Sequence, residues 1–305
     1  MLVALGLLAA GGLVLYVGAE AAVRGAAGLA RAVGISPFVL GALLFGIDVE
    51  SMGTAVAAAA RGETSLAAGT VVGTVLFLYG PAFGAALIVA RRPVPAPKPL
   101  LILTPALHLV AGAFTMADRY VARIEGMFLV VMYLAYVGLL LRLGRTPVAM
   151  EREARATRSA PVMAALTLGG LAMLAVGGTV AIAGATRFAA ATGLAAGFVG
   201  AAVLGVLVSL DEVLVEVLPI RRGTPELATG NLFGTLPALA AGVLGLAALV
   251  RPLDVDSAAA AGYLAMAFLY AVVATALLIR GRAGKVLGAF VLLCYAGWLV
   301  ATSTL

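Results

Sequence analysis

The chain has 305 residues, of which 63% are hydrophobic and 11% are charged. A soluble globular protein carries about a quarter charged residues, so this composition excludes that class. It predicts an all-α, polytopic membrane protein whose main partner is the lipid bilayer. The formal net charge of +6 does not indicate a nucleic-acid partner, because the basic residues stand at the ends of apolar runs.

About ten apolar runs are long enough to cross a bilayer as helices. They cover residues 2–33, 36–60, 65–90, 99–117, 120–141, 160–191, 195–220, 226–250, 257–279 and 284–304. The polar segment 145–159 separates five runs from five and is expected to be a cytoplasmic loop. It divides the chain into a first five-helix unit, residues 1–144, and a second one, residues 160–305.

The distribution of basic residues predicts the orientation in the membrane. With the N-terminus outside, 15 Lys and Arg residues fall at inside ends and 5 at outside ends, which favours both termini outside. The 18 Arg against 2 Lys, with much Ala and Gly, are typical of a GC-rich bacterial genome. We therefore expect a multi-pass protein of a prokaryotic plasma membrane, acting as a monomer.

The two units resemble each other in sequence. Residues 61–74 recur as residues 222–235, and Gly126 with Tyr133 matches Gly288 with Tyr295. The offset between the units drifts only from 159 to 162 residues along the whole chain. Because each unit has an odd number of spans, the sequence predicts two inverted repeats, the plan of secondary transporters that bind their substrate near the membrane midplane.

Acidic residues lie inside the second span of each unit. Asp48 and Glu50 stand within residues 36–60, and Asp211 and Glu212 within residues 195–220. Four charged carboxylates at this depth would cost on the order of 10 kcal/mol, and no Lys or Arg is predicted at the same depth. A bound cation or a proton is the remaining partner.

The surrounding motifs resemble those of the calcium/cation antiporter superfamily, which includes the sodium/calcium exchangers. The resemblance rests on the Gly- and Ala-rich lead-ins at residues 18–44 and 177–204, on GTVVGTV from Gly69, and on GNLFGTL from Gly230. The resemblance implies secondary-active exchange of a divalent cation, Ca²⁺ first, for protons or Na⁺ by alternating access. It implies no cofactor other than the transported inorganic cation.

The resemblance also implies which residues bind the ion. The family's Gly-Thr-Ser-x-Pro-Glu box aligns with residues 46–51 and 207–212, so that its serine falls on Asp48 and Ser209 and its glutamate on Ser51 and Glu212. Positions three apart share a helix face, so these residues would present two carboxylates and two hydroxyls to one cavity. Such oxygen ligands suit Ca²⁺, Mg²⁺, Mn²⁺ or Na⁺.

Other candidates have supporting parts in this prediction. Glu50 and Asp211 are rotated by about 100° from that face, which leaves direct ligation and proton binding both open. The family's third-helix box implies Thr74 and Thr235 as ligands. Other positions that are polar in the family's third helix are apolar in this chain, namely Val75, Leu78, Leu236 and Leu239. Thr70 and Asn231 occupy matching positions, where hydrogen bonding between helices competes with coordination. The apolar replacements favour protons over Na⁺ as the coupling ion.

Several further residues carry weaker expectations. Glu216 is expected near the inner vestibule, either attracting cations or solvated at the interface. His108 is expected to pack, and Pro81 and Pro237 to kink the third and eighth spans. Without the box proline, a break in the second span rests on Gly46.

The sequence has no serine–histidine, HExxH or cysteine-nucleophile arrangement, so an enzyme is not expected. The alternative function is a ten-helix drug/metabolite-type transporter of an organic substrate.

Overall fold

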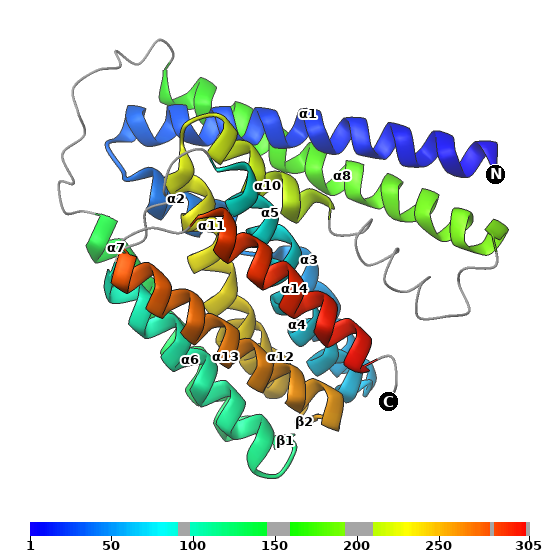
Figure 1. Cartoon of the computed structure of the whole chain (residues 1–305), viewed down its shortest axis with the longest axis vertical. Coiled ribbons are helices and arrows are strands. Elements are labelled where there is room, and N and C mark those ends of the chain that lie inside the picture. The colour runs from blue at the N-terminus through cyan, green and yellow to red at the C-terminus, as the bar shows by residue number, and fades with distance from the viewer. Residues whose placement is uncertain (91–97, 145–158, 193–209, 281–283, 303–305) are drawn as a thin grey trace.

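The computed structural model describes residues 1–90, 98–144, 159–192, 210–280 and 284–302 (Figure 1). The first part of the chain forms α1 (Leu2–Val33), α2 (Pro37–Leu44), α3 (Val49–Arg61), α4 (Thr64–Phe77), the π-helical turn η1 (Leu78–Ala82), α5 (Phe83–Val89), α6 (Lys98–Ala117), β1 (Tyr120–Val121) and α7 (Arg123–Gly144). The second part forms α8 (Ala160–Thr192), α10 (Leu210–Arg221), α11 (Pro225–Pro237), the π-helical turn η3 (Ala238–Val243), α12 (Leu244–Val250), β2 (Leu253–Asp254), α13 (Ser257–Arg280) and α14 (Lys285–Thr302).

The described chain is helical apart from one short ladder. Strands β1 and β2 pair antiparallel, Tyr120 with Asp254 and Val121 with Leu253. Within the described residues, 7 helical stretches are long and apolar enough to cross a membrane. These stretches are Leu2–Val33, Thr64–Val89, Lys98–Thr115, Arg123–Arg142, Ala160–Thr192, Pro225–Val250 and Ala260–Leu277. The predicted class, a polytopic α-helical membrane protein, is confirmed.

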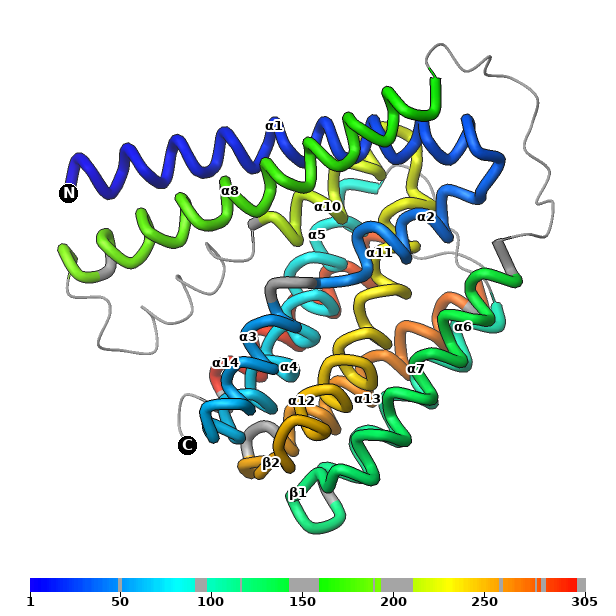
Figure 2. Tube along the Cα trace, turned by 180° about the vertical axis from the view of Figure 1, so that it is seen from behind, coloured from blue at the N-terminus to red at the C-terminus, as the bar shows by residue number. Residues whose placement is uncertain are grey.

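Helices α1 and α8 lie side by side and run antiparallel across one side of the remaining helices (Figures 1 and 2). Their backbones approach closely at glycines: a Cβ on Gly18 would lie 2.9 Å from the Leu174 amide nitrogen, and a Cβ on Gly177 would lie 2.7 Å from that of Leu15. Gly177 and Leu174 lie 159 positions after Gly18 and Leu15, so each contact is the counterpart of the other in the opposite half of the chain. The pair is therefore packed reciprocally, by small residues that let two helices meet at the backbone.

The same reciprocity recurs elsewhere in the fold. A Cβ on Gly80 would meet the Tyr295 side chain, and one on Gly242 would meet the Tyr133 side chain. The following turn adds close approaches of Gly84 to Gly288 and of Gly126 to Gly245. As a result α14 packs on η1 and α5 in the way that α7 packs on η3 and α12.

The second predicted span, residues 36–60, is not one helix but breaks near Gly46, the residue on which the expected break rested. Helix α2 ends at Leu44 and α3 begins at Val49. At the break, a Cβ on Gly46 would lie 2.7 Å from the Gly234 Cα, so only glycine allows α2 and α11 to lie this close. The helix therefore breaks although the box proline is absent.

The third span of each unit contains a π-helical turn rather than a plain α-helix. Pro81 lies inside η1, and Pro237 is the residue before η3. Because proline lacks an N–H and its ring crowds the preceding turn, widening the helix locally accommodates it. The prediction of distortions at these prolines is confirmed.

Aromatic and hydroxyl side chains fill the core beneath these turns. The buried His108 ring packs beside the contacting rings of Tyr79 and Tyr270, with centroids 6.1 and 6.0 Å away. Its Nδ1 is 2.8 Å from the Thr104 carbonyl oxygen. Tyr136 donates a 2.6 Å hydrogen bond to the Phe233 carbonyl of α11. The expectation that His108 packs in the core is confirmed.

The reciprocal α1–α8 contact can be tested with two adjacent glycines. A Cβ at Gly170 would collide with the Ala22 amide nitrogen and lie 2.6 Å from the Gly18 carbonyl oxygen, whereas one at Gly169 meets no described atom within 4 Å. Gly170→Ala should lower the unfolding free energy by about 1–3 kcal/mol. Gly169→Ala should be neutral or slightly stabilising, and equal melting temperatures for the two variants in detergent would contradict this packing.

Candidate cation-binding site

A cavity of about 300 Å³ lies where the break between α2 and α3 faces α10, α11 and α8. Its polar lining comes from both halves of the chain. The lining residues are Leu44, Phe45, Ile47, Asp48, Leu171, Leu174, Ala175, Asp211, Glu212, Val215 and Asn231. The structure thus brings Asp48 together with Asp211 and Glu212, which lie more than 160 residues later in the sequence.

Asp48 has two functions in this geometry. Its Oδ1 accepts a 2.9 Å hydrogen bond from the Ser51 amide, which caps the first turn of α3. A carboxylate at a helix N-terminus is stabilised by the unpaired N–H groups and by the helix dipole. The second carboxylate oxygen takes no part in this cap, and the half-buried side chain lines the cavity.

Ser51 lies one turn further along α3. Its hydroxyl is 3.2 Å from the Thr74 hydroxyl of α4. Neither residue is among those lining the cavity, so the hydroxyl pair supports the cavity wall by linking α3 to α4. Thr70 lies one turn before Thr74 and donates to the Leu66 carbonyl of its own helix, at 2.9 Å.

Asp211 and Glu212 lie at the start of the described part of α10. Both side chains are half-buried and both line the cavity. Asp211 therefore faces the same cavity as Glu212, although its position on a regular helix predicted a rotation away from it.

Glu216 lies in the protein interior rather than at the vestibule, and the expected interfacial position was wrong. The side chain is fully buried, and its Oε1 accepts a 3.0 Å hydrogen bond from the Asn231 amide. Thr235 in turn donates to Asn231 Oδ1 at 3.1 Å. Among the described residues, Glu216 Oε2 has no hydrogen-bond partner. This chain fixes the amide of Asn231, which lines the cavity, so Asn231 and Thr235 join Glu216 to the candidate site.

Two predicted ligands cannot be placed. Ser209 lies outside the described residues, and so does the side chain of Glu50. Among the described side chains, no three His, Cys, Asp or Glu residues come close enough to hold a metal ion as one cluster. Asp48, Asp211 and Glu212 line one cavity without converging on a single point.

Sequence reasoning missed a polar contact that ties α1 to the core. Glu20 forms ion pairs with Arg24, at 2.5 Å, and with Arg222 in the turn after α10. The Glu20 side chain is only 13% exposed. The α1–α8 pair supplies the apolar cavity wall through Leu171, Leu174 and Ala175. A lone acid in the first span, with an arginine one turn later, was the available signal.

The cavity offers oxygen ligands and helix ends to an ion. The break leaves the last carbonyls of α2 without helical partners, and Leu44 and Phe45 at that end line the cavity beside three carboxylates. Carboxylates and backbone carbonyls are the ligands of hard cations. Discontinuous helices with such ends are the usual ion sites of secondary transporters.

Known proteins resemble this chain over most of its length. The profile of the family described as "Sodium/calcium exchanger protein" matches residues 3–142 and 162–304. A proposed antiporter, CaxA of Alkalimonas amylolytica, is 27% identical over 94% of this chain and 95% of its own. The inner membrane protein YrbG of Escherichia coli (strain K12) is 27% identical over 84% of this chain and 82% of its own.

Solved structures agree in fold. The sodium-calcium exchanger NCX_Mj soaked with 2.5 mM Na⁺ and 1 mM Sr²⁺ superposes with a TM-score of 0.84, covering 100% of this chain and 99% of that chain at 20% identity. The same exchanger soaked with zero Na⁺ and Ca²⁺ gives a TM-score of 0.83 over 99% of both chains, also at 20% identity.

The role of Glu216 can be tested with two substitutions. Glu216→Leu leaves the Asn231 amide without its acceptor, so we expect about 1–3 kcal/mol lower stability and weaker cation binding. Glu216→Gln keeps an oxygen acceptor for Asn231 and should retain most of the stability. Thermal unfolding in detergent and Ca²⁺ titration of both variants measure these effects; equal loss in both would show that the acceptor at Oε1 is not what matters.

Proposed function

The chain belongs to the sodium/calcium exchanger family, and from this membership and its cavity we propose that it is a secondary-active antiporter of a divalent cation, Ca²⁺ first. The observation that carries the proposal is the cavity itself, in which Asp48 from one half of the chain and Asp211 and Glu212 from the other line about 300 Å³. Carboxylates that line one cavity are oxygen ligands for a hard cation. A small cavity lined by three acids favours an inorganic cation over the organic substrate of a drug/metabolite-type transporter.

We propose that two inverted five-helix repeats, residues 1–144 and 160–305, build this site. The reciprocal contacts support the arrangement: Gly18 to Leu174 corresponds to Gly177 to Leu15, and Gly80 to Tyr295 corresponds to Gly242 to Tyr133. Inverted repeats allow two conformations of similar energy, which open the binding site to opposite sides of the membrane. With the charge distribution, this gives a prokaryotic plasma-membrane protein with both termini outside and residues 145–159 as a cytoplasmic loop.

Within this proposal the described ligands are Asp48 and Glu212, with Asp211 beside them. Ser51 and Thr74 support α3, while Asn231, held by Glu216 and Thr235, contributes its amide to the cavity wall. Glu50 and Ser209 complete the set as ligands or proton carriers. The α1–α8 pair covers the cavity with apolar side chains, so movement of this pair relative to the core is the proposed route to alternating access.

We propose protons rather than Na⁺ as the coupling ion. Val75, Leu78, Leu236 and Leu239 are fully buried apolar residues at positions where the family resemblance implies polar ligands. They leave few oxygens for several Na⁺ ions. Charged carboxyl groups that line one cavity repel each other, so protons and an entering divalent cation would compete for the same groups.

Removing the carboxylates should abolish exchange without unfolding the protein. Asn caps a helix as well as Asp, so Asp48→Asn keeps the α3 cap and removes only the charge. We expect Asp48→Asn and Glu212→Gln each to abolish uptake of radiolabelled Ca²⁺ into proteoliposomes. Glu63→Gln, which removes a half-exposed acid paired with Arg61 at 3.4 Å, is the matched control and should transport normally. Full uptake by both site variants would exclude these residues as ligands.

The coupling ion can be measured in the same proteoliposomes. A pH gradient should drive Ca²⁺ movement at constant Na⁺, while a Na⁺ gradient at constant pH should drive little. Glu50→Gln should change mainly the pH dependence, because it removes one proton-binding group and leaves Asp48 and Glu212 in place. Transport driven by a Na⁺ gradient and indifferent to a pH gradient would refute the proton assignment.

A further inference from the structure

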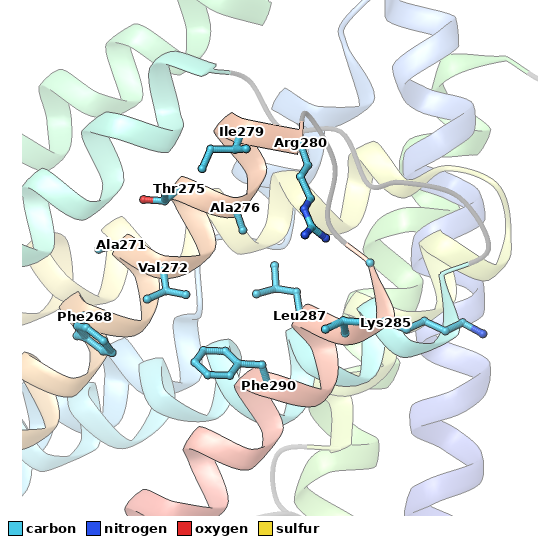
Figure 3. Close-up of a pocket in the computed structure, with 12 residues that line it drawn as sticks. Phe268, Ala271, Val272, Thr275, Ala276, Ile279, Arg280, Lys285, Leu287 and Phe290 are labelled. Atoms are coloured by element: carbon cyan, nitrogen blue, oxygen red, sulfur yellow. The ribbon is translucent and has the colours of Figure 1, made fainter.

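A second and larger cavity lies between the end of α13 and the beginning of α14, away from the cation site (Figure 3). Its volume is about 780 Å³, within the range of about 300–1,000 Å³ that holds small ligands. None of its lining residues lines the cation cavity. The transport mechanism proposed above makes no use of it.

The lining of this groove is apolar along the helices and basic at one end. Phe268, Val272 and Ala276 of α13 face Leu287 and Phe290 of α14 across the groove (Figure 3). The walls are open to the surroundings, since Phe268 is 68% exposed and Ile279 is 78% exposed. A groove of this kind on a membrane-spanning bundle faces hydrocarbon, so acyl chains match its walls.

The basic end of the groove supplies positive charge. Arg280 is the last residue of α13 and Lys285 the first of α14. In Figure 3 the Arg280 guanidinium turns toward α14, and the Lys285 side chain extends outward from the other side of the groove end. The described lining contains no acidic residue. The first N–H groups of the 18-residue α14 add positive potential at the same place.

We propose that this groove binds one anionic phospholipid, with its phosphate held by Arg280 and Lys285 and an acyl chain lying along Phe268, Val272 and Phe290. The order of chemistry, cationic at the helix ends and apolar toward the middle of the bundle, is that of a phospholipid at the membrane surface. Basic pockets between spanning helices bind anionic lipid headgroups in this way. A free phosphate ion would leave the apolar walls without a partner.

The lipid would stabilise the helix that packs against the core. Helix α14 contacts η1 and α5 through Tyr295 against Gly80 and Gly288 against Gly84. On its other side the groove separates its first turns from α13. An acyl chain in the groove fills this gap and holds α14 against the π-helical turn, so bound lipid should raise the melting temperature.

The test compares lipids of equal chain length and different charge. Full-length protein in detergent is titrated with phosphatidylglycerol or phosphatidylcholine, and bound lipid is counted by native mass spectrometry alongside thermal unfolding. We expect one phosphatidylglycerol per protein, preferred over phosphatidylcholine by roughly tenfold or more because two cations lie at this end of the groove, with a preference that falls as salt is added. Glycerol 3-phosphate, a headgroup without chains, should not compete.

Three variants separate the charge from the groove. Arg280→Gln with Lys285→Gln should remove the preference for the anionic lipid and its thermal stabilisation. Lys98→Gln with Arg142→Gln removes the same charge from exposed ends of α6 and α7, outside the groove lining, and should keep both. Ala276→Trp fills the groove and should weaken binding of both lipids while the two cations remain.

The proposal is overturned if wild type shows no preference for phosphatidylglycerol, or if the Lys98 and Arg142 control loses the preference as fully as the groove variant. Unchanged lipid binding by Ala276→Trp would also overturn it, since the lipid would then be held by surface charge alone. Loss of Ca²⁺ exchange by Asp48→Asn does not bear on any of these results, so the two proposals fail separately.

Discussion

The close approach of α2 to α11 is the constraint on which the cation site depends. Gly46 and Gly234 meet with no room for a Cβ, and Gly41 and Gly230 allow the same along the rest of α2. This contact ends α2 at Leu44 and lets α3 begin again at Val49 with Asp48 as its cap. The break puts the carbonyl end of one helix and the N–H end of another at one cavity. A straight helix over the same residues would satisfy those backbone groups internally and leave no backbone carbonyl or N–H group for a ligand.

The two halves support the cavity with different chemistry. In the first half, Ser51 and Thr74 join α3 to α4 by one hydroxyl contact, and Ala55 lies one turn further. In the second half, the residue 161 positions after Ala55 is Glu216, which holds Asn231 and through it Thr235. An amide held from both sides has little freedom to rotate. The asymmetry gives the second half the more rigid wall and an additional buried acid, a distribution suited to a site that exchanges charge.

The α1–α8 pair has a different relation to the core from the other helices. Its backbones are packed against each other at glycines, whereas its tie to the turn after α10 is the ion pair of Glu20 with Arg222. Apolar contacts slide more readily than backbone hydrogen bonds, and a single ion pair can break and re-form. The pair also covers the cavity with Leu171, Leu174 and Ala175. In the proposed mechanism, the α1–α8 pair covers the ion and the broken core helices bind it.

The sequence by itself determined the membrane class, the two similar halves and several candidate residues that line one cavity, because spanning length, charge depth and a constant offset are properties of the chain. Asp48, Glu212, Asp211 and Asn231 were found this way. The sequence pointed to Gly46 as the place where the second span could break, and only the tertiary structure showed the break and the close approach of Gly46 to Gly234 on a distant helix. The tertiary structure also decided that Glu216 is buried: its position one turn after Glu212 fits a vestibule equally well, and only the Asn231 amide of α11 provides an interior partner. Spacing along one helix predicts which residues share a face, whereas the packing of other helices decides what covers that face.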